Sequence, residues 1–364
     1  MPNRTRWRRI ILPIAFTLAL GTVGGWVFDF WRMPLAWMIG AMCVTTIAAV
    51  AGAPVKSSPT LRNIMIPVLG IMLGSSFTPE ALENAHLWVP SLLTMLAYVA
   101  FVATCVGIFF YRVVGVGAIT SFFSATPGGL ATMVVLGSDK GGDERTIALT
   151  HSVRILLTVL IIPFWFRLFE GYEPGGLNLL GTIDHLALKD AALLVLCGFV
   201  GVYGGRLLRL PSAQVLGPML ASVALHLSGI TEAKPPVEVI NIAQIVIGSG
   251  IGARFAGIDL RFVAKVMSAA VASTIFMVSL AAVIAILLQA ATGLPFQAVL
   301  LSFAPGGLAE MALISLSMGI DPAFVSTHHL LRVAFMVSAA PIAFHFLERR
   351  YGITGDTACA EKTA

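Results

Sequence analysis

The chain alternates between long runs of apolar residues and short joints that hold proline, glycine and charge. Most runs approach the roughly 20 residues that an α-helix needs to cross the hydrocarbon core of a bilayer. Typical joints are 54–56, 79–80, 234–236 and 293–295. The pattern predicts an all-α polytopic membrane protein with apolar segments at about 10–28, 35–53, 62–77, 87–110, 115–137, 146–168, 190–208, 213–229, 238–255, 265–290, 296–318 and 323–347.

Composition supports the same class. Hydrophobic residues make up 57% of the chain and charged residues 11%, whereas a soluble domain carries about 25% charged residues. The longest polar connection, about Glu170 to Lys189, is expected to be a loop. The net charge of +5 comes from basic residues at segment ends, so no nucleic-acid partner is expected. The expected partners are membrane lipid and a small-molecule solute, and a homo-oligomer is left open.

The sequence contains the same piece twice. Pro-Gly-Gly-Leu-Ala occurs at 127–131 and again, 178 positions later, at 305–309. The same offset relates Gly70 to Gly248, Gly74 to Gly252, His151 to His329, Arg154 to Arg332 and Pro163 to Pro341. We therefore expect a first membrane repeat at 1–172, a second at 189–351 and a cytoplasmic tail at 352–364. Duplicated halves with interrupted apolar segments are typical of membrane transporters.

The distribution of positive charge predicts the orientation of the two halves. Cytoplasmic loops carry an excess of Lys and Arg, which places the arginine-rich N-terminus inside. If each Pro-Gly-Gly segment enters and returns on the same side, the basic residues at 206–209 and 254–265 also fall inside. If each segment spans, these residues fall outside. The better fit is two inverted repeats, each with about five transmembrane helices and one broken or re-entrant segment. Both termini are then cytoplasmic, in a bacterial-type inner (plasma) membrane.

The Pro-Gly-Gly elements are candidate binding sites. Proline lacks a backbone donor and glycine is flexible, so a helix is interrupted there. The freed backbone groups cannot face lipid and must lie in the protein interior. A helix that restarts after the break would offer its N-terminus to an anion. The alternative is a kink that only lets two helices cross. The candidate residues are Pro127, Gly128, Gly129, Pro305, Gly306 and Gly307.

Each half also carries a His-x-x-Arg pair inside an apolar segment, His151 with Arg154 and His329 with Arg332. A buried arginine costs about 2.5 kcal/mol or more at the centre of a bilayer. Three residues apart on a helix is one face, so histidine and arginine point the same way. Either the pairs bind an anionic substrate, or each arginine bonds the loose carbonyls of the broken segment. Both roles can coexist in different halves.

Glu310 breaks the symmetry, because its equivalent in the first half is Thr132. A carboxylate in an apolar segment is a candidate partner for Arg332, a candidate proton carrier in the coupling step, or a group exposed at a helix end. We expect the pairing with Arg332. Arg154, which has no such carboxylate, is then the better candidate to hold an anionic substrate.

Two further repeated motifs are Pro-x-x-x-x-x-Gly, at 34–40 and 211–217, and Gly-x-x-x-Gly, at 70–74 and 248–252. The second spacing lets helices approach closely, so it favours packing. Together with Pro-Gly-Gly-Leu and the later arginine, these motifs resemble the AbrB-type family of integral membrane proteins over nearly the whole chain. The resemblance implies an internally duplicated membrane protein similar to inverted-repeat transporters with crossed broken helices. Proteins of this family carry labels of ammonia monooxygenase or regulator of gene expression.

The sequence argues against both labels as direct activities. A copper or iron oxygenase needs clustered histidines or carboxylates, and the histidines here are scattered. A transcription factor needs a basic DNA-reading element outside the membrane, for which there is no room. No enzyme activity, cofactor or metal is expected. We predict a secondary transporter or exporter of a small anionic or amphipathic solute. The alternative is a membrane sensor that acts on gene expression indirectly.

Overall fold

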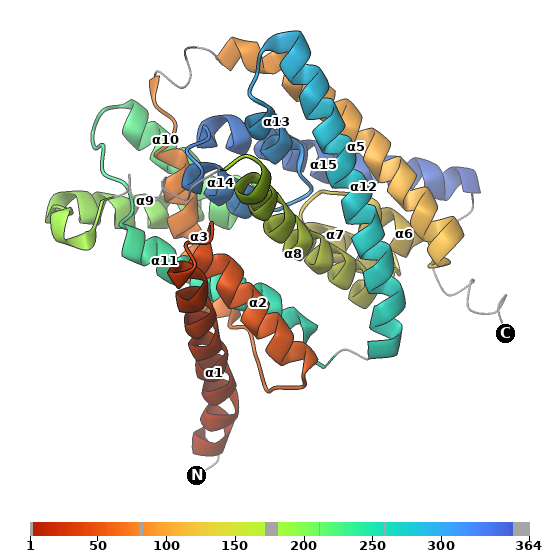
Figure 1. Cartoon of the computed structure of the whole chain (residues 1–364), viewed down its shortest axis with the longest axis horizontal. Helices are drawn as coiled ribbons and strands as arrows, with labels where there is room; N and C mark the ends of the chain where they lie inside the picture. The colour runs from red at the N-terminus through yellow and green to blue at the C-terminus, as the bar shows by residue number, and fades with distance from the viewer. Residues whose placement is uncertain are drawn as a thin grey trace. The chain divides into compact units, whose positions relative to one another are not determined.

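A computed structural model describes residues 3–79, 83, 85–171, 181–210, 212–257 and 260–351, and all regular structure in this part of the chain is helical (Figure 1). The all-α prediction is therefore confirmed. The predicted tail at 352–364 and residues 172–180 of the predicted loop at 170–189 lie outside the described residues. The elements are α1 (Asn3–Phe30), α2 (Ala36–Val50), α3 (Pro59–Gly74), η1 (Ala85–Trp88), α5 (Val89–Phe109), η2 (Phe110–Val114), α6 (Ala118–Ala125), α7 (Leu130–Asp139), α8 (Glu144–Phe169), η4 (Ile183–His185), α9 (Leu188–Leu207), α10 (Ala213–Leu227), α11 (Val237–Gly252), η5 (Ala253–Phe255), α12 (Leu260–Thr292), α13 (Phe296–Phe303), α14 (Leu308–Ser317) and α15 (Pro322–Tyr351).

Several of these helices are suited to a bilayer. Within the described residues, seven stretches are long and apolar enough to cross a membrane, and shorter apolar helices such as α2, α3 and α10 lie between them in the chain. The prediction of a polytopic membrane protein is thus supported by length and composition. The seven stretches are Ile10–Phe30, Ala85–Val114, Glu144–Phe169, Leu188–Leu207, Val237–Phe255, Ala264–Thr292 and Pro322–Arg350.

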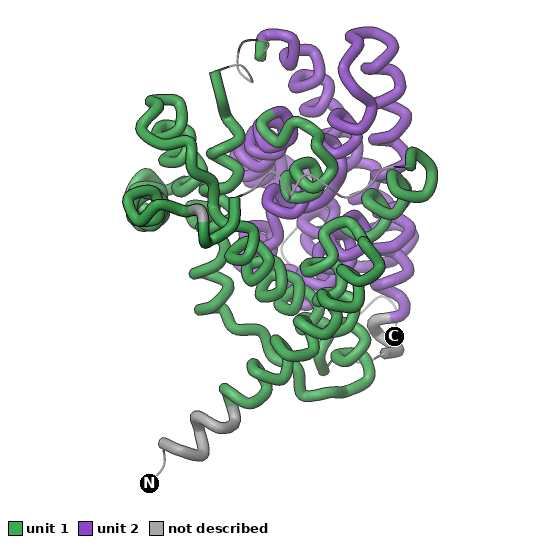
Figure 2. Tube along the Cα trace, turned by 60° about the vertical axis from the view of Figure 1, so that its left-hand side comes forward, with its two compact units in different colours: residues 1–85, 159–258, 312–323 green, residues 86–158, 259–311, 324–364 purple. Residues whose placement is uncertain are grey.

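The chain forms two compact units, and each unit draws on both predicted halves (Figure 2). Unit 1 comprises residues 1–85, 159–258 and 312–323, and unit 2 comprises 86–158, 259–311 and 324–364. Unit 1 thus contains α1, α2 and α3 together with their second-half equivalents α9, α10 and α11. The boundaries of the compact units do not follow the predicted repeats at 1–172 and 189–351.

Within unit 1, a helix from one half packs against a helix from the other half, and each such contact occurs twice, once with the roles of the two halves reversed. Helix α10 packs on α3, and its equivalent α2 packs on α11. The repeated glycines make this possible. A Cβ at Gly70 would lie 2.6 Å from the carbonyl oxygen of Val215, and a Cβ at Gly248 would overlap the carbonyl oxygen of Met38. The packing interpretation of Gly-x-x-x-Gly is therefore confirmed.

A second pair of close contacts joins α1 to α2 and α9 to α10. Gly24 and Gly40 face each other across the first pair, and Gly201 and Gly217 face each other across the second. At each crossing, a Cβ on either glycine would overlap backbone atoms of the other helix. Pro211, the start of the second Pro-x-x-x-x-x-Gly motif, lies outside the described residues.

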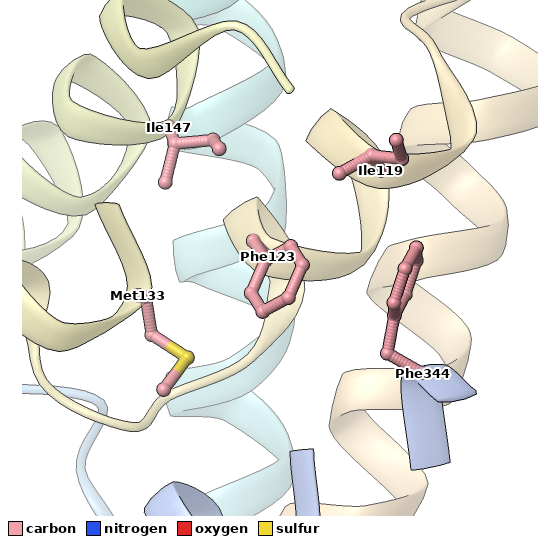
Figure 3. Packing of buried hydrophobic residues seen from close by; sticks show 5 residues of the cluster. All are labelled: Ile119, Phe123, Met133, Ile147 and Phe344. Carbon is pink, nitrogen blue, oxygen red and sulfur yellow. The ribbon is translucent and has the colours of Figure 1, made fainter. Parts of the chain in front are cut away.

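Unit 2 contains a helical hairpin around the first Pro-Gly-Gly. Helix α6 stops at Ala125, α7 starts at Leu130, and the chain between them turns at Gly129 with a φ of 93°, which favours glycine. The two ends of the hairpin lie together, because the Asp143 amide donates to Thr120 Oγ1 over 2.7 Å. Figure 3 shows Phe123 of α6 at the centre of the apolar cluster that holds this hairpin, between Met133, Ile147, Ile119 and Phe344.

The crossing of α9 and α10 yields a prediction with a control on the same helix. Gly201→Ala should destabilise the protein by about 1–3 kcal/mol, because the new methyl group overpacks the contact with α10. Gly204→Ala should be neutral or slightly stabilising, because nothing lies within 4 Å of a Cβ at that position. Thermal unfolding of the purified variants in detergent measures both effects. Equal melting temperatures for the two variants would contradict the close crossing.

Candidate functional site

The two histidines of the His-x-x-Arg pairs hold equivalent parts of the two broken segments. His151 Nε2 lies 2.9 Å from the carbonyl oxygen of Phe123, in the last turn of α6. His329 Nε2 lies 2.9 Å from the carbonyl oxygen of Leu301, in the last turn of α13. Carbonyls in the last turn of a helix have no partner within the helix. Each histidine therefore satisfies a backbone group that the break leaves unpaired, and the repeat offset of 178 holds for these contacts.

The hydrogen bonds of His151 define its tautomer. Arg154 Nη2 lies 2.5 Å from His151 Nδ1, and a guanidinium can only donate. His151 Nδ1 must then accept, and the ring proton lies on Nε2, where it is donated to the carbonyl of Phe123. His151 is therefore neutral in this arrangement and orients the guanidinium of Arg154.

The two arginines differ in how firmly they bind the broken segments. Arg332 donates from Nη1 to the carbonyl of Ala304 and from Nη2 to that of Gly306, both over 2.6 Å. Arg154 Nη1 is 3.4 Å from the carbonyl of Ser124, near the limit for a hydrogen bond. The role of bonding loose carbonyls is therefore seen clearly for Arg332 and only weakly for Arg154.

The charges of both guanidinium groups are buried. Arg154 is 4% exposed and Arg332 is 3% exposed, and no aspartate or glutamate is among the buried residues of the described chain. The two guanidinium groups lie within electrostatic range of each other, and the side chain of Tyr98 on α5 lies within the same range. Tyr98 itself donates to the carbonyl of Met277 over 2.9 Å. Two buried cations thus lie together with no buried carboxylate to neutralise them.

The predicted pairing of Glu310 with Arg332 is wrong. Both residues are described, and no ion pair joins them; Arg332 is occupied by two backbone carbonyls instead. Glu310 lies in the first turn of α14, where its carboxylate folds back against Gly307. A negative charge there is stabilised by the positive end of the helix dipole. Glu310 thus lies at a helix end, as one alternative expected, but it is only partly exposed. Its role as a proton carrier stays a prediction.

The glycines of the two breaks are covered by a pair of methionines that the sequence reasoning missed. Met133 Sδ lies 3.1 Å from the position of a Cβ on Gly128, and Met311 Sδ lies 2.8 Å from that on Gly306. The methionines are 178 positions apart, so the repeat offset carried a signal for them. Close covering by a side chain explains why the middle residue of each Pro-Gly-Gly is glycine.

His328 also has a defined place, although its first-half equivalent is Thr150. Its Nε2 is 2.8 Å from Ser91 Oγ, and its Nδ1 is 2.8 Å from the carbonyl of Phe324. The ring packs on that of Phe324, with 4.2 Å between centroids. His328 thus ties α15 to the start of α5. Across the described residues, no three His, Cys, Asp or Glu side chains come together as a metal site.

These observations define a class: a polytopic membrane protein whose interrupted helices are held by buried histidines and arginines. The sequence profile described as "Transition state regulatory protein AbrB" matches residues 37–348. The chain therefore belongs to the AbrB family, which confirms the resemblance of its motifs.

Two curated relatives cover nearly the whole chain. "Uncharacterized protein YhjN" of Bacillus subtilis (strain 168) is 23% identical over 357 residues, which is 92% of this chain and 93% of the relative. "Putative regulator AbrB" of Escherichia coli (strain K12) is 25% identical over 328 residues, which is 87% of this chain and 91% of the relative.

The unequal bonding of the arginines predicts unequal effects on stability. Arg332→Gln should lower stability more than Arg154→Gln, because it leaves the carbonyls of Ala304 and Gly306 without their donors. Each unsatisfied buried group costs about 1–3 kcal/mol. Thermal unfolding in detergent at matched concentration compares the variants. A larger loss for Arg154→Gln would refute the clamping role of Arg332.

Proposed function

We propose that this protein is a secondary transporter of a small anionic solute. The observation that carries the proposal is the pair of buried guanidinium groups in unit 2, which have no buried carboxylate beside them. A charge in a membrane interior is costly and marks substrate or ion pathways. An anion from outside the protein is the natural partner for these cations, and a site that binds and releases such an anion is the core of a transporter.

The directions of helices in unit 1 support inverted repeats. Gly70 faces Val215, and one turn later Gly74 faces Met219, so α3 and α10 run in the same direction. In the same way Gly248 and Gly252 show that α11 runs with α2. Since α2 and α3 follow each other through a short connection, they run in opposite directions if both span. In that case helix α10 runs opposite to α2, its equivalent in the first half, as an inverted repeat requires.

The hairpin in unit 2 supports re-entry of the Pro-Gly-Gly segment. Gly142, after α7, lies next to Ile119 and Thr120 at the start of α6. The hairpin thus begins and ends at one level, which is the property of a segment that returns to the side it came from. With five further spans in each half, an odd number of crossings inverts the second half. Both termini then lie on the cytoplasmic side of a bacterial-type inner membrane.

Cysteine labelling tests this topology at equivalent positions of the two halves. Arg112 and Ala290 are 178 residues apart, and both are exposed. In a background without the native cysteines, Arg112→Cys should react from the cytoplasmic side and Ala290→Cys from the opposite side. An impermeant maleimide applied to intact cells and to inverted vesicles distinguishes the sides. Reaction of both cysteines from one side would favour parallel halves and end the inverted model.

Solute movement tests the role of the buried arginines. A thermal-shift screen of the purified protein against small anions would identify a solute, since a ligand at 100 times its dissociation constant adds about 2.7 kcal/mol. In proteoliposomes, Arg154→Ala should reduce uptake of that solute at least about tenfold, the effect of losing roughly 1.4 kcal/mol of interaction. The control is Arg206→Ala, which changes an exposed arginine on α9 and should leave transport normal. Normal uptake by both variants would show that Arg154 does not take part in moving the solute.

The alternative function is a membrane sensor that acts on gene expression through a partner. The name of the Escherichia coli relative calls that protein a regulator, which is the observation that favours this reading. A sensor would bind the solute in the thermal-shift assay without moving it across proteoliposomes. Binding without flux in the wild-type protein would therefore favour the sensor over the transporter.

A further inference from the structure

The buried polar atoms without a hydrogen-bond partner are concentrated in two places in the described chain. One is α11 of unit 1, and the other is the region around the two arginines of unit 2. In a membrane interior such atoms are costly, because no bulk water is present to replace a missing partner. The atoms in unit 2 are Ser124 Oγ, Thr150 Oγ1, Arg154 Nε, Ser326 Oγ, His329 Nδ1 and Arg332 Nε.

We propose that Ser124, Thr150 and Arg154 form the binding site for a small oxyanion. This inference rests on the proposed function and adds to it the residues of the site and the chemical class of the solute. Ser124 is 0% exposed, Thr150 is 2% exposed and Arg154 is 4% exposed. Each contributes an O–H or N–H group that no protein atom accepts.

The three residues come from two elements that are in contact, α6 and α8. Thr150 and Arg154 are four residues apart on α8, so they share one face of that helix. Ser124 is in the last turn of α6, and Arg154 Nη1 reaches its carbonyl oxygen. His151, between the two on α8, accepts from Arg154 Nη2 and orients the guanidinium. The arrangement therefore holds its donors in place before any ligand arrives.

The equivalent positions of the second half serve as an internal control. Ser302, the equivalent of Ser124, donates to the carbonyl of Ala298 over 2.8 Å. His328, in the place of Thr150, is bonded to Ser91 and to the carbonyl of Phe324. The hydroxyl and imidazole groups that occupy these two positions are thus satisfied by the protein itself.

Arg332 also differs from Arg154 in its acceptors. Both of its terminal nitrogens donate to backbone carbonyls over 2.6 Å, whereas Arg154 bonds His151 and reaches the carbonyl of Ser124 only over 3.4 Å. His329 Nε2 bonds a carbonyl, so in the neutral ring the unpartnered Nδ1 is an acceptor and does not attract an anion. We therefore assign a structural role to the second-half pair. The ligand site belongs to the first half, although the charge of Arg332 adds to the positive potential there.

The chemistry of the donors indicates the class of ligand. A guanidinium and two hydroxyl groups match the several lone pairs of a carboxylate, phosphate or sulfate, and charge-assisted hydrogen bonds of this kind are short and strong. The uncompensated positive charge requires a negative ligand. Carboxylates and phosphates share this chemistry, and the test below separates them.

The experiment measures the thermal stability of the purified full chain with acetate, succinate, phosphate, sulfate or chloride at constant ionic strength. We expect at least one oxyanion to raise the melting temperature of the wild-type protein in a saturable manner, and chloride to do so less. The anion that acts at the lowest concentration identifies the ligand as a carboxylate or a phosphate-like group. Equal effects of chloride and every oxyanion, or no effect of any, would overturn the proposal.

Paired variants locate the site. Ser124→Ala and Thr150→Val should each raise the dissociation constant of the active anion about tenfold, as expected for the loss of one hydrogen bond to a charged group. Their melting temperatures without the anion should be equal to or above the wild-type value, because each removes a hydroxyl group that has no partner in the protein. A merely structural hydroxyl would lower stability and leave the dissociation constant unchanged.

The matched controls are Ser302→Ala, the same change at the equivalent position, and Thr274→Val, a buried threonine of α12 that donates to the carbonyl of Ala270 over 2.7 Å. Both should keep the wild-type dissociation constant. Wild-type affinity in Ser124→Ala and Thr150→Val would overturn this site, and flux in proteoliposomes that still depended on Arg154 would leave the transporter proposal standing. Conversely, anion binding that depends on these hydroxyl groups without any flux would overturn transport and leave the site standing.

Discussion

The structure of unit 2 depends on one constraint: where a helix is broken inside a membrane protein, its freed backbone carbonyls cannot face lipid and need other hydrogen-bond partners. Here the partners are two histidines and two arginines, placed at equivalent positions of the two halves. The histidines bond the last turns of α6 and α13, and Arg332 bonds the chain just after α13. The break can exist because these long side chains reach it from the neighbouring helices α8 and α15.

The same constraint explains why cations lie where a membrane protein would otherwise avoid them. Arginine has five donors and no acceptor, so it can hold several carbonyls at once while its charge stays uncompensated. In the second half this capacity is used on the backbone. In the first half, Arg154 Nη2 bonds His151 instead, and the contact of Arg154 Nη1 with the carbonyl of Ser124 is long, at 3.4 Å. The two elements thus share their geometry, but only Arg332 uses both terminal nitrogens on backbone carbonyls.

Much of the fold could be predicted from the sequence, because the apolar periodicity and the repeat offset of 178 can both be seen in the chain without knowledge of its contacts. They located the membrane helices, the breaks, the glycine crossings and the two His-x-x-Arg pairs. The pairing of Glu310 with Arg332 failed for a physical reason. Nearness in one half of the sequence does not determine which way a guanidinium turns, and here two backbone carbonyls accept from the terminal nitrogens of Arg332. Tyr98 was missed because it comes from α5 and has no tyrosine at the equivalent position.

The composition of the compact units could not be read from the repeats either, since each unit combines equivalent helices of both halves. In unit 1 the crossings of α1 with α2 and of α2 with α11 each have a partner crossing with the halves exchanged, and glycines lie at both. The same sequence pattern thus makes each contact twice, so where the two copies differ, one copy can be compared with the other within the same molecule. That internal reference gives the asymmetry of unit 2 its meaning. Where the copies bond alike, as at the Nε2 atoms of His151 and His329, the role is structural. Where only the first copy leaves a hydroxyl group unbonded, as at Ser124 and Thr150, the unbonded groups are the ones assigned to a ligand.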